Sequence, residues 1–405
     1  MIDDPSHDVP LSDRPQHTDT VAVHAGRADL AALGVHAAPI DLSSTNPLPD
    51  ILHGGDSYEA MATGGHPLPD GGNVYARLWN PTVARFEEAL AELEHAEAAV
   101  AFSSGMAAMT AAILSHTSAM SLRHIVAVRP LYGGTDHLLD SGLLGAEITF
   151  CAEDEVHGAI RPDTGLVVVE TPGNPTLDLV DIAGVVAQAG EVPVLVDNTF
   201  ATPLLQNPLD LGARMSLHSA TKYIGGHGDV IAGVIACSEE TAQALRRVRA
   251  ITGALLHPLG AYLLHRGLAT LPVRLERQQQ SAERIVAWLA EQPEVAEVFY
   301  PGIADRRGLI PRQMRGGGAM IAIRLRDGYA AAEALTGSVR LFTHAVSLGG
   351  VDSLVQHPAA LTHRPVAAEA RPGADVVRLS IGLEHPDDLI GDLAQALSRV
   401  TAAVR

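Results

Sequence analysis

Cysteine is scarce in this sequence of 405 residues, which contains only two, Cys151 and Cys237. Each lies in an apolar run typical of a β-strand, so both are expected to be buried as small hydrophobic side chains. Two such thiols do not build the disulfide framework of a small secreted protein, and they favour a reducing compartment. The sequence therefore predicts a cytoplasmic protein.

Long hydrophobic stretches are also missing. No apolar run approaches the roughly 20 residues that a membrane-spanning helix needs. The N-terminal residues 1–19 are acidic, polar and proline-containing, and they lack the apolar core of a secretory signal. We therefore expect no membrane partner, and we expect residues 1–19 to be disordered.

Positive charge is in short supply, because 28 Lys and Arg residues face 47 Asp and Glu residues, for a formal net charge of −19. Nucleic acids and anionic membranes are bound by basic surfaces, so neither is an expected partner. An anionic substrate would need a local cationic pocket. The 19 histidines show neither HExxH nor Cys/His spacing, so no metal site is predicted. The missing GxxxxGK[ST] motif excludes a P-loop NTPase.

The most informative stretch that is present is SLHSATKYIGGHGDVIAG (216–233), where Lys222 stands between small hydroxyl residues and a run of glycines. Such a lysine is either a solvated charge or a buried amine. An apolar strand expected over 230–237 would hold Lys222 against a core, and desolvation lowers the pKa of a lysine and frees its amine to attack a carbonyl. Ser219 and Thr221 are suited to bind a phosphate. The pattern favours a Schiff-base lysine for pyridoxal 5′-phosphate.

A carboxylate that such a cofactor needs stands 25 residues before Lys222, at Asp197 in the apolar segment VLVDNTF (194–200). Ligand sites in open α/β sheets lie at the carboxyl ends of the strands. An aspartate there either caps the following helix or faces the cofactor's ring nitrogen and keeps it protonated. The pairing with Lys222 favours the second interpretation.

Apolar segments of strand length alternate with segments of helix length through the middle of the chain. Strands are expected over residues 98–102, 124–129, 147–151, 166–170 and 192–198. These runs are continuously apolar, as in a parallel sheet that is buried on both faces. The sequence therefore predicts a doubly wound, mostly parallel α/β domain, whose first helix begins at Asn80 and Pro81.

The two ends of the chain differ from this domain. The composition of residues 20–73, and of 48–73 above all, is typical of a long loop. Near the C-terminus, an α+β region is predicted from a helix over 278–292, strands over 319–325 and 376–382, and a last helix over 387–404. We expect three parts: an N-terminal arm (1–74), a large α/β domain (75–265) and a smaller C-terminal α+β domain (266–405).

A phosphate-binding turn is expected where the strand 98–102 leads into a helix. The turn SSGMA (103–107) places the N–H groups of Gly105 and Met106 at a helix N-terminus, which attracts anions. Tyr75 and Arg77 add a phenol and a guanidinium suited to phosphate oxygens, although the same pair would also suit a solvated surface.

Arg378 lies inside the apolar strand VVRLSIG (376–382). A buried, unpaired charge is costly, so this guanidinium needs a partner. The partner is either a carboxylate of the protein, in a structural salt bridge, or an anionic ligand.

Five motifs stand in a common order along most of the chain: YARLWNPT (75–82), SSGMA (103–107), ETPGNPTLD (170–178), HSATKYIGGHG (218–228) and SLGGVDSLVQHPAALTH (347–363). Together they resemble the cystathionine γ-synthase/methionine γ-lyase family, which is the Cys/Met-metabolism group of fold-type I pyridoxal-phosphate enzymes. The resemblance implies an aspartate aminotransferase-like fold and pyridoxal 5′-phosphate as the cofactor.

The resemblance also implies roles for single residues. Tyr132 would stack on the cofactor ring and serve as acid and base, its pKa lowered by a neighbouring cation. Asn174 would hydrogen-bond the cofactor's phenolic oxygen. Arg378, helped by the backbone near Ser347, would bind the substrate carboxylate, and Lys222 would remove the proton from the substrate's α-carbon.

In similar enzymes the Tyr-x-Arg pair and the N-terminal arm reach into the neighbouring subunit. The resemblance therefore implies that Tyr75 and Arg77 act on the partner's cofactor. It implies an obligate dimer within a tetramer.

The reaction is expected to depend on the distal part of the substrate pocket. Relatives that handle cystathionine carry acids where Val346 and Val74 stand, and a basic residue where His137 stands. A pocket without those charges leaves the distal amino-acid end of cystathionine unpaired. Gly134 is a departure from methionine γ-lyases, which have cysteine there.

We expect γ-elimination from an L-amino acid with a small or apolar γ-substituent, giving a 2-oxo acid, ammonia and the leaving group. The alternative within the family is a γ-replacement synthase, which joins a nucleophile to the same carbon. A catalytically inactive binding or scaffold protein is a third interpretation, disfavoured because each chemical position considered is filled.

Overall fold

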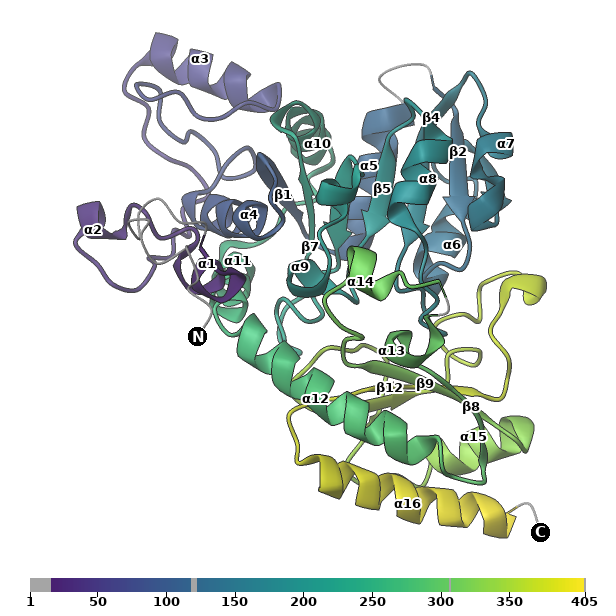
Figure 1. The fold of residues 1–405 in the computed structure, drawn as a ribbon. Coiled ribbons are helices and arrows are strands. Elements are labelled where there is room, and N and C mark those ends of the chain that lie inside the picture. The colour runs from purple at the N-terminus through teal and green to yellow at the C-terminus, as the bar shows by residue number, and fades with distance from the viewer. Residues whose placement is uncertain (1–15, 118–121, 306, 404–405) are drawn as a thin grey trace, which may run out of the picture.

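Seven strands form the large sheet of the computed structural model, which describes residues 16–117, 122–305 and 307–403 (Figure 1). Their order is β1-β7-β6-β5-β4-β2-β3. The strands are β1 (Ala98–Phe102), β2 (His124–Val128), β3 (Glu147–Cys151), β4 (Thr164–Glu170), β5 (Val194–Asp197), β6 (Met215–His218) and β7 (Gly233–Cys237). Only β7 runs antiparallel to its neighbours in this sheet. The predicted mostly parallel sheet is confirmed, while the strand expected over 230–237 begins at Gly233.

Helices cover both faces of this sheet, because alternate residues of its buried strands point to opposite sides. Val100, Ile125 and Leu195 pack on one face with α5 (Gly105–Thr117), α6 (Gly133–Asp140) and α10 (Glu239–Thr252). The other face packs against α4 (Pro81–Leu93), α7 (Val156–Ala159), α8 (Ile182–Ala189), α9 (Thr202–Leu205) and α11 (Pro258–Leu268). The 3₁₀ turns η3 (Glu153–Glu155) and η4 (Pro208–Leu211) complete these connections. The predicted doubly wound arrangement is therefore observed.

The start of α4 follows its sequence signal. Asn80 Oδ1 accepts hydrogen bonds from the N–H groups of Thr82 and Val83, at 2.9 and 3.2 Å, and Pro81 occupies the first helical position. This cap satisfies amides that have no partner within the helix. The helix is thereby aligned under the sheet, with its far end at Glu94 completely buried.

A second, smaller sheet lies below the first in Figure 1, with strand order β10-β11-β12-β9-β8. Its strands are β8 (Val295–Phe299), β9 (Met320–Leu325), β10 (Thr343–His344), β11 (Leu354–Gln356) and β12 (Val376–Ser380). Its helices are α12 (Leu271–Leu289), α13 (Pro301–Ala304), α14 (Ile310–Gln313), α15 (Gly328–Thr336) and α16 (Pro386–Ala403), with a 3₁₀ turn η5 (Ala368–Ala370). The predicted α+β region is confirmed, although the helix expected over 278–292 begins earlier, at Leu271.

The N-terminal part contains more helix than expected. It forms α1 (Thr18–His24), α2 (Leu30–Leu33) and α3 (Ile51–Ala62), so the prediction of a loop over 48–73 is wrong in its first half. Asp50 caps α3 by accepting a hydrogen bond from the N–H of His53 at 2.8 Å. Of the segment expected to be disordered, residues 1–15 lie outside the described part, whereas Thr18 already belongs to α1.

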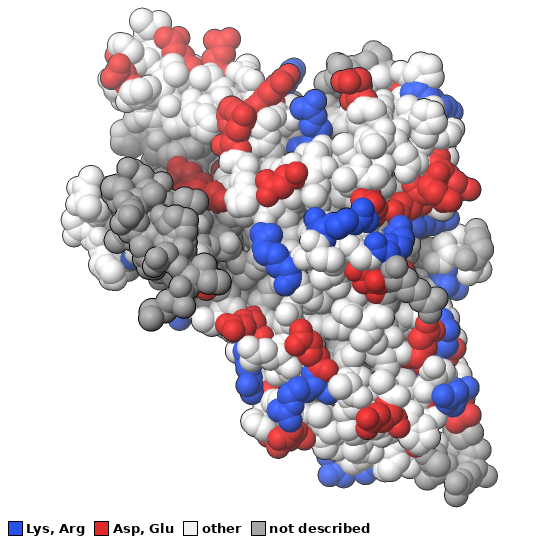
Figure 2. Space-filling model, viewed as in Figure 1, with Lys and Arg blue, Asp and Glu red and all other residues white. Residues whose placement is uncertain are grey.

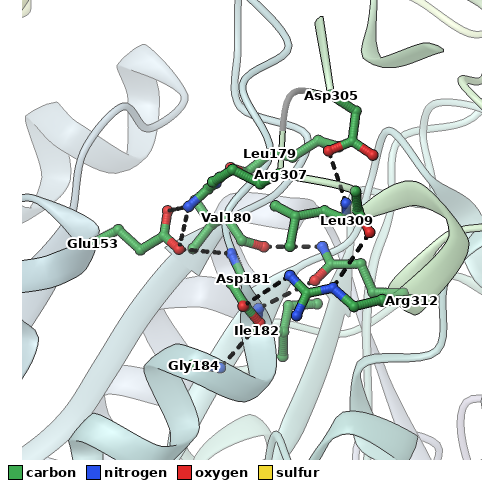
Figure 3. Close-up of polar contacts among 12 residues, drawn as sticks. Glu153, Leu179, Val180, Asp181, Ile182, Gly184, Asp305, Arg307, Leu309 and Arg312 are labelled. Atoms are coloured by element: carbon green, nitrogen blue, oxygen red, sulfur yellow. Dashed lines mark hydrogen bonds and ion pairs between the residues drawn. The ribbon is translucent and has the colours of Figure 1, made fainter.

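A group of polar contacts joins the two sheets' domains (Figure 3). Arg307 contacts the Glu153 carboxylate at 2.9 and 3.0 Å, and Arg312 contacts Asp181 at 3.3 Å. Gln313 Nε2 donates to the carbonyl of Val180 at 2.9 Å. The segment around α14 is thus attached to the loop that precedes α8. The small domain is held against the edge of the large sheet where its parallel strands end.

The described residues contain no helix that is both long enough and apolar enough to cross a membrane. Acidic and basic side chains are interspersed over the face seen in Figure 2, with wide uncharged areas between them. Cys237 is buried and Cys151 partly so, and neither forms a disulfide. Cys237 therefore lies in the core as expected, and Cys151 lies nearer the surface on the edge strand β3.

Candidate active site

A cavity of about 320 Å³ lies between the two domains. Its volume falls in the range of small-molecule sites. The large domain contributes the carboxyl ends of β4, β5 and β6, and the small domain contributes residues near β12. It is lined by Ser104, Gly105, Met106, Met109, Tyr132, Thr135, Glu170, Asn174, Asp197, Thr199, Phe200, Leu217, Ser219, Thr221, Lys222, Ile231, Val346, Ser347, Leu348, Thr362 and Arg378.

Lys222 is the only lysine in the chain, and its side chain points into this cavity. The amine donates a hydrogen bond to Ser347 Oγ at 2.9 Å. Burial, together with the nearby Arg378 cation, lowers the pKa of Lys222 to about 8. A sizeable fraction of this amine is therefore neutral near physiological pH, as a nucleophile or base requires. The predicted desolvated lysine is observed.

Asp197 ends β5 and faces the same cavity. Its Oδ1 accepts hydrogen bonds from both the backbone N–H and the hydroxyl of Thr199, at 3.1 and 2.5 Å. Burial raises the pKa of Asp197, and the bonds from Thr199 oppose that effect. One carboxylate oxygen is thus fixed by the chain, and this geometry directs the group toward the cavity instead of toward a helix end.

Arg378 is 3 % exposed and has no carboxylate among the partners that the structure describes. Its guanidinium donates to Asn174 Oδ1 and to the carbonyl of Ser347, each at 2.9 Å, and to Gln356 Oε1. Burial lowers the pKa of Arg378 to about 10. A structural salt bridge, one of the two expectations for this residue, is not found in the described chain. The cation remains available to an anionic ligand.

Ser347 adopts a left-handed backbone, with φ = +94°, which is costly for a residue other than glycine. This conformation directs its carbonyl to Arg378 and its hydroxyl to Lys222. The strained turn therefore joins the two cations of the cavity through one residue. Strain of this kind is common at functional sites.

The predicted phosphate cradle is present in part. Ser104 Oγ accepts a hydrogen bond from the N–H of Ala107 at 3.0 Å, so the turn caps α5. Ser219 lies against Gly105 so closely that a Cβ there would stand 3.1 Å from the Ser219 hydroxyl oxygen. Thr221 lines the cavity too, but its hydroxyl exchanges hydrogen bonds with the backbone of Ala232. Ser219 and the N-terminus of α5 therefore lie together at one corner of the cavity, the arrangement that an anion site would need.

These residues fit pyridoxal 5′-phosphate. A desolvated amine, a strand-end carboxylate and a helix N-terminus beside a hydroxyl all open into one cavity, as an aldehyde, a ring nitrogen and a phosphate require. The aldehyde would be held by Lys222 and the ring nitrogen by Asp197. The phosphate would be held by Ser219 and the first amides of α5, those of Gly105 and Met106.

Tyr132 lines the cavity with its ring against Gly134, where a Cβ would stand 2.5 Å from the ring. A side chain at position 134 would force the ring to move, so the observed position of the Tyr132 ring requires glycine there. Burial raises the pKa of Tyr132 and outweighs the opposing effect of the Arg378 cation. The expected lowering of this pKa is therefore wrong for the protein's own groups, because desolvation exceeds the influence of one cation.

Four predicted residues do not line the cavity of their own chain. Tyr75 is exposed, and the Arg77 guanidinium lies 5.6 Å from its ring centroid and donates to the carbonyl of Ala250 at 2.5 Å. His137 lies exposed on α6 and does not line the cavity. Val74 likewise belongs to the segment around Tyr75. Val346, in contrast, lines the cavity and is 55 % exposed there.

Glu170 is a cavity residue to which the sequence assigned no role. Its carboxylate accepts hydrogen bonds from the N–H groups of Tyr132 and Asn174, at 2.5 and 3.1 Å. It ends β4 directly beside Asp197 of β5. Burial and this second carboxylate raise the pKa of Glu170 well above its ordinary range. Thr199 and Gln356 were missed as well, although the strand-end rule that selected Asp197 would also have selected Glu170.

Comparison with known proteins agrees with this geometry. Residues 19–398 match the model of a family described as "Cys/Met metabolism PLP-dependent enzyme". An L-methionine gamma-lyase of Brevibacterium sandarakinum is 60 % identical over 96 % of this chain and 99 % of its own length.

Two solved structures share the fold. Cystathionine gamma synthase from Xanthomonas oryzae pv. oryzae has a TM-score of 0.86 and 35 % identity, with 96 % of this chain and 100 % of that chain covered. A cystathionine gamma lyase from Micromonospora echinospora has a TM-score of 0.83 and 37 % identity, covering 95 % and 100 %.

The pKa of Lys222 leads to a first prediction. In cofactor-free protein, an amine-specific acylating reagent should modify Lys222 half-maximally near pH 8, the value that burial imposes. Replacing Arg378 by Met removes a cation that disfavours the ammonium form, so the midpoint should move to higher pH. Mass spectrometry of the peptide that contains Lys222 measures both midpoints, without interference from other side-chain amines.

The control for this labelling is Arg324→Met, which removes a partly exposed arginine of the small domain that is paired with Glu297. It should leave the midpoint unchanged. A wild-type midpoint near that of a free lysine would contradict the burial of this amine.

Proposed function

Because the chain belongs to the Cys/Met metabolism PLP-dependent enzyme family, we propose that it is the γ-lyase of this family that acts on L-methionine, releasing a 2-oxo acid, ammonia and the thiol. The chain is a pyridoxal-phosphate-dependent carbon–sulfur lyase, and the substrate is an L-amino acid with a γ-leaving group. One observation carries the assignment: the only lysine of the chain lies desolvated in a cavity that also holds Asp197 and Arg378.

Pyridoxal 5′-phosphate, when bound to Lys222, supplies the electron sink that stabilises negative charge at the substrate's α-carbon. Asp197, fixed by Thr199, would hold a proton on the ring nitrogen. Ser219 and the first amides of α5 would bind the phosphate. Asn174 would face the phenolic oxygen, while its Oδ1 stays bonded to Arg378.

The remaining groups would handle the substrate. Arg378 would bind the α-carboxylate, since it has cationic charge without a protein carboxylate among its described partners. Lys222, as a neutral amine, would take the proton from the α-carbon. Tyr132, which keeps its phenolic proton because its pKa is raised, would donate that proton to the departing thiolate.

Val346, Ile231 and Leu348 contribute apolar side chains to the lining of the cavity. A methyl thioether can be buried there without leaving a charge unpaired. The distal ammonium and carboxylate of cystathionine would lose water without gaining partners among the described residues of this cavity. This supports L-methionine over cystathionine.

A homo-oligomer with shared active sites is proposed as the assembly. Arg378 and Lys222 are the cations that line the cavity, and neither stands in the predicted phosphate corner. Tyr75 and Arg77 lie away from their own cavity, and α3 exposes Ile51 and Leu52. A partner that brings Tyr75 and Arg77 to this corner would supply the missing cation. We propose a dimer of this kind within a tetramer, located in the cytoplasm, to which the free thiols are suited.

The domain limits follow the same proposal. Residues 1–74 form the arm toward the partner, 75–265 the large domain and 266–405 the small one. The second limit falls inside α11, and α12 then carries the chain along both domains.

The function is tested by a substrate panel. Purified holoenzyme should release 2-oxo acid from L-methionine faster than from L-cystathionine at equal concentration. Much faster release from cystathionine would contradict the apolar-pocket argument. Consumption of a γ-activated homoserine ester only in the presence of a thiol, with no oxo acid from either amino acid, would identify the γ-replacement synthase instead.

Val346 provides the sharper test of specificity. Val346→Glu places a carboxylate in the cavity wall, where it can pair with the distal ammonium of cystathionine. One charge-assisted hydrogen bond is worth about 1.5–3 kcal/mol, so the ratio of kcat/KM for cystathionine to that for methionine should rise about ten- to a hundredfold. Val346→Gln, of equal size but uncharged, is the control and should shift this ratio far less. Equal shifts in both variants would show that charge is not the determinant.

The shared site is tested by complementation. Arg77→Ala and Lys222→Ala should each be inactive alone. If Arg77 acts across the interface, mixed dimers contain one intact site, and random pairing should restore about a quarter of wild-type activity. Activity is measured after the two chains are unfolded and refolded together. No recovery, although mixed dimers are detected by native mass spectrometry, would place Arg77 outside the partner's site.

A further inference from the structure

A buried carboxylate–imidazole pair, Glu94 and His218, involves the strand next to that of Asp197. Glu94 follows the last turn of α4 and is 0 % exposed, and His218 ends β6 and is 1 % exposed. Glu94 Oε1 and His218 Nε2 are 2.5 Å apart. Neither residue lines the cavity, and the proposed mechanism uses neither. Two ionisable groups are thus completely removed from water with no role assigned to them.

The pair is connected to the site by the sheet itself. Asp197 of β5 pairs with Leu217 of β6, so Asp197 and His218 stand on adjacent strands, one residue apart in register. Asn198, the residue after Asp197, donates from its backbone N–H to the carbonyl of Leu217 at 2.8 Å and from its amide to Glu94 Oε1 at 3.2 Å. Glu94 therefore contacts both Asn198 and His218, the residues that follow Asp197 and Leu217 on the two paired strands.

The pair has few other polar partners among the described residues that could balance the charge of Glu94. In the described part of the chain, no Lys or Arg forms an ion pair with Glu94, and Glu94 Oε2 and His218 Nδ1 have no hydrogen-bond partner. An ionised carboxylate that is completely buried needs a compensating cation. His218 is the ionisable side chain that touches Glu94, so it is the group that can pair with this carboxylate, and it stands on the strand adjacent to Asp197.

On the two strands adjacent to β5, two ionisable groups affect Asp197 in opposite directions. Glu170 on β4 stands directly opposite it and disfavours a second negative charge. His218 on β6 favours the ionised form. The other elements that pack against β6 include β7, η4 and α5. On β7, the residue opposite His218 is the apolar Val234. Asp210 of η4 is exposed and paired with His95, and α5 carries His116.

We propose that Glu94 and His218 are positioning residues that keep Asp197 ionised, so that it can hold the proton on the cofactor's ring nitrogen. This inference rests on the proposed placement of Asp197 against that nitrogen. Glu94 acts through His218, and neither touches the cofactor. His218 supplies the positive charge that offsets burial and the neighbouring Glu170, and Glu94 is the counter-ion that holds its ring.

The test compares Glu94→Gln and His218→Gln with the wild-type holoenzyme. Loss of the imidazolium raises the pKa of Asp197, so Asp197 stays protonated to higher pH. The acidic limb of the kcat/KM profile should move upward by about one pH unit, and the dissociation constant of pyridoxal 5′-phosphate should rise about tenfold. The dissociation constant and the pH titration of the bound cofactor's absorbance are readouts independent of turnover.

His124→Gln is the matched control. His124 is as deeply buried as His218, but it begins β2, and its ring nitrogens contact the hydroxyls of Thr164 and Thr149 at 2.7 and 2.8 Å. It lies at the end of the sheet opposite the cavity. The variant should lower stability in the same way as the others while leaving the cofactor's dissociation constant and the pH profile unchanged. Equal changes in this control would overturn the proposal.

A double variant and a melting experiment separate positioning from general damage. Because the pair acts as a unit, Glu94→Gln/His218→Gln should weaken cofactor binding no more than either single change, and additive losses would contradict this. The gain in melting temperature on adding cofactor should shrink in the variants, since it depends on affinity. If His218→Gln does not fold, Glu94→Gln, which keeps size and shape, decides alone.

Asp197→Asn distinguishes failure of this inference from failure of the proposed site. If Asp197→Asn keeps wild-type cofactor affinity and absorbance, the placement of Asp197 is wrong and the inference falls with it. If Asp197→Asn weakens binding while Glu94→Gln does not, the site stands and the role of the pair is refuted.

Discussion

The cavity depends on two cationic side chains, Arg378 and Lys222, that have no carboxylate partner among the described residues. Lys222 donates to a serine hydroxyl, and Arg378 donates to one backbone carbonyl and two side-chain amides. Neutral oxygen acceptors satisfy the N–H groups of a buried cation but do not cancel its charge. The fold therefore keeps the buried Arg378 guanidinium without a direct ion pair among the described residues, in a chain whose formal net charge is −19. That state is costly in the free protein and favours an anionic ligand that enters the cavity.

Two domains are needed to produce this arrangement. The large sheet brings Glu170, Asp197 and the segment with Lys222 to one edge, because parallel strands end on the same side. The small domain supplies Arg378 from β12 and Ser347 from a strained turn. The contacts of Arg307, Arg312 and Gln313 keep that domain at the edge of the sheet (Figure 3). The strain at Ser347 is tolerated because both of its polar groups are bonded: the hydroxyl to Lys222 across the domain boundary, and the carbonyl to Arg378 of the same domain.

Much of this site could be predicted from single-sequence patterns, and the failures have physical causes. Lys222 and Asp197 were recognisable because each adjoins an apolar strand, and the motifs of the Cys/Met-metabolism family supported them. The helix α3 was missed because His53 and two glycines interrupt its pattern, and only the Asp50 cap marks its start. The pKa of Tyr132 was predicted in the wrong direction because a sequence shows a nearby cation but not the depth of burial.

Positions that are proposed to act between chains are the hardest to place. Tyr75 and Arg77 form a recognisable motif, yet in a single chain they lie beside Ala250 and not in the cavity. Glu94 and His218 belong to no common motif. They are 124 positions apart in the sequence, and their contact could not be expected without knowing how the strands are ordered in the sheet.

The two carboxyl groups at the edge of the cavity, Glu170 and Asp197, have different environments. Glu170 and Asp197 stand side by side at the ends of β4 and β5, and two adjacent buried carboxylates cannot both ionise at low cost. The fold treats them differently. Asp197 receives two hydrogen bonds from Thr199 and has His218 on the adjacent strand, whereas Glu170 receives two backbone amides and is the more strongly raised in pKa. A protonated Glu170 would fix the backbones of Tyr132 and Asn174 without adding charge. The negative charge is then concentrated on Asp197, where a protonated ring nitrogen would neutralise it.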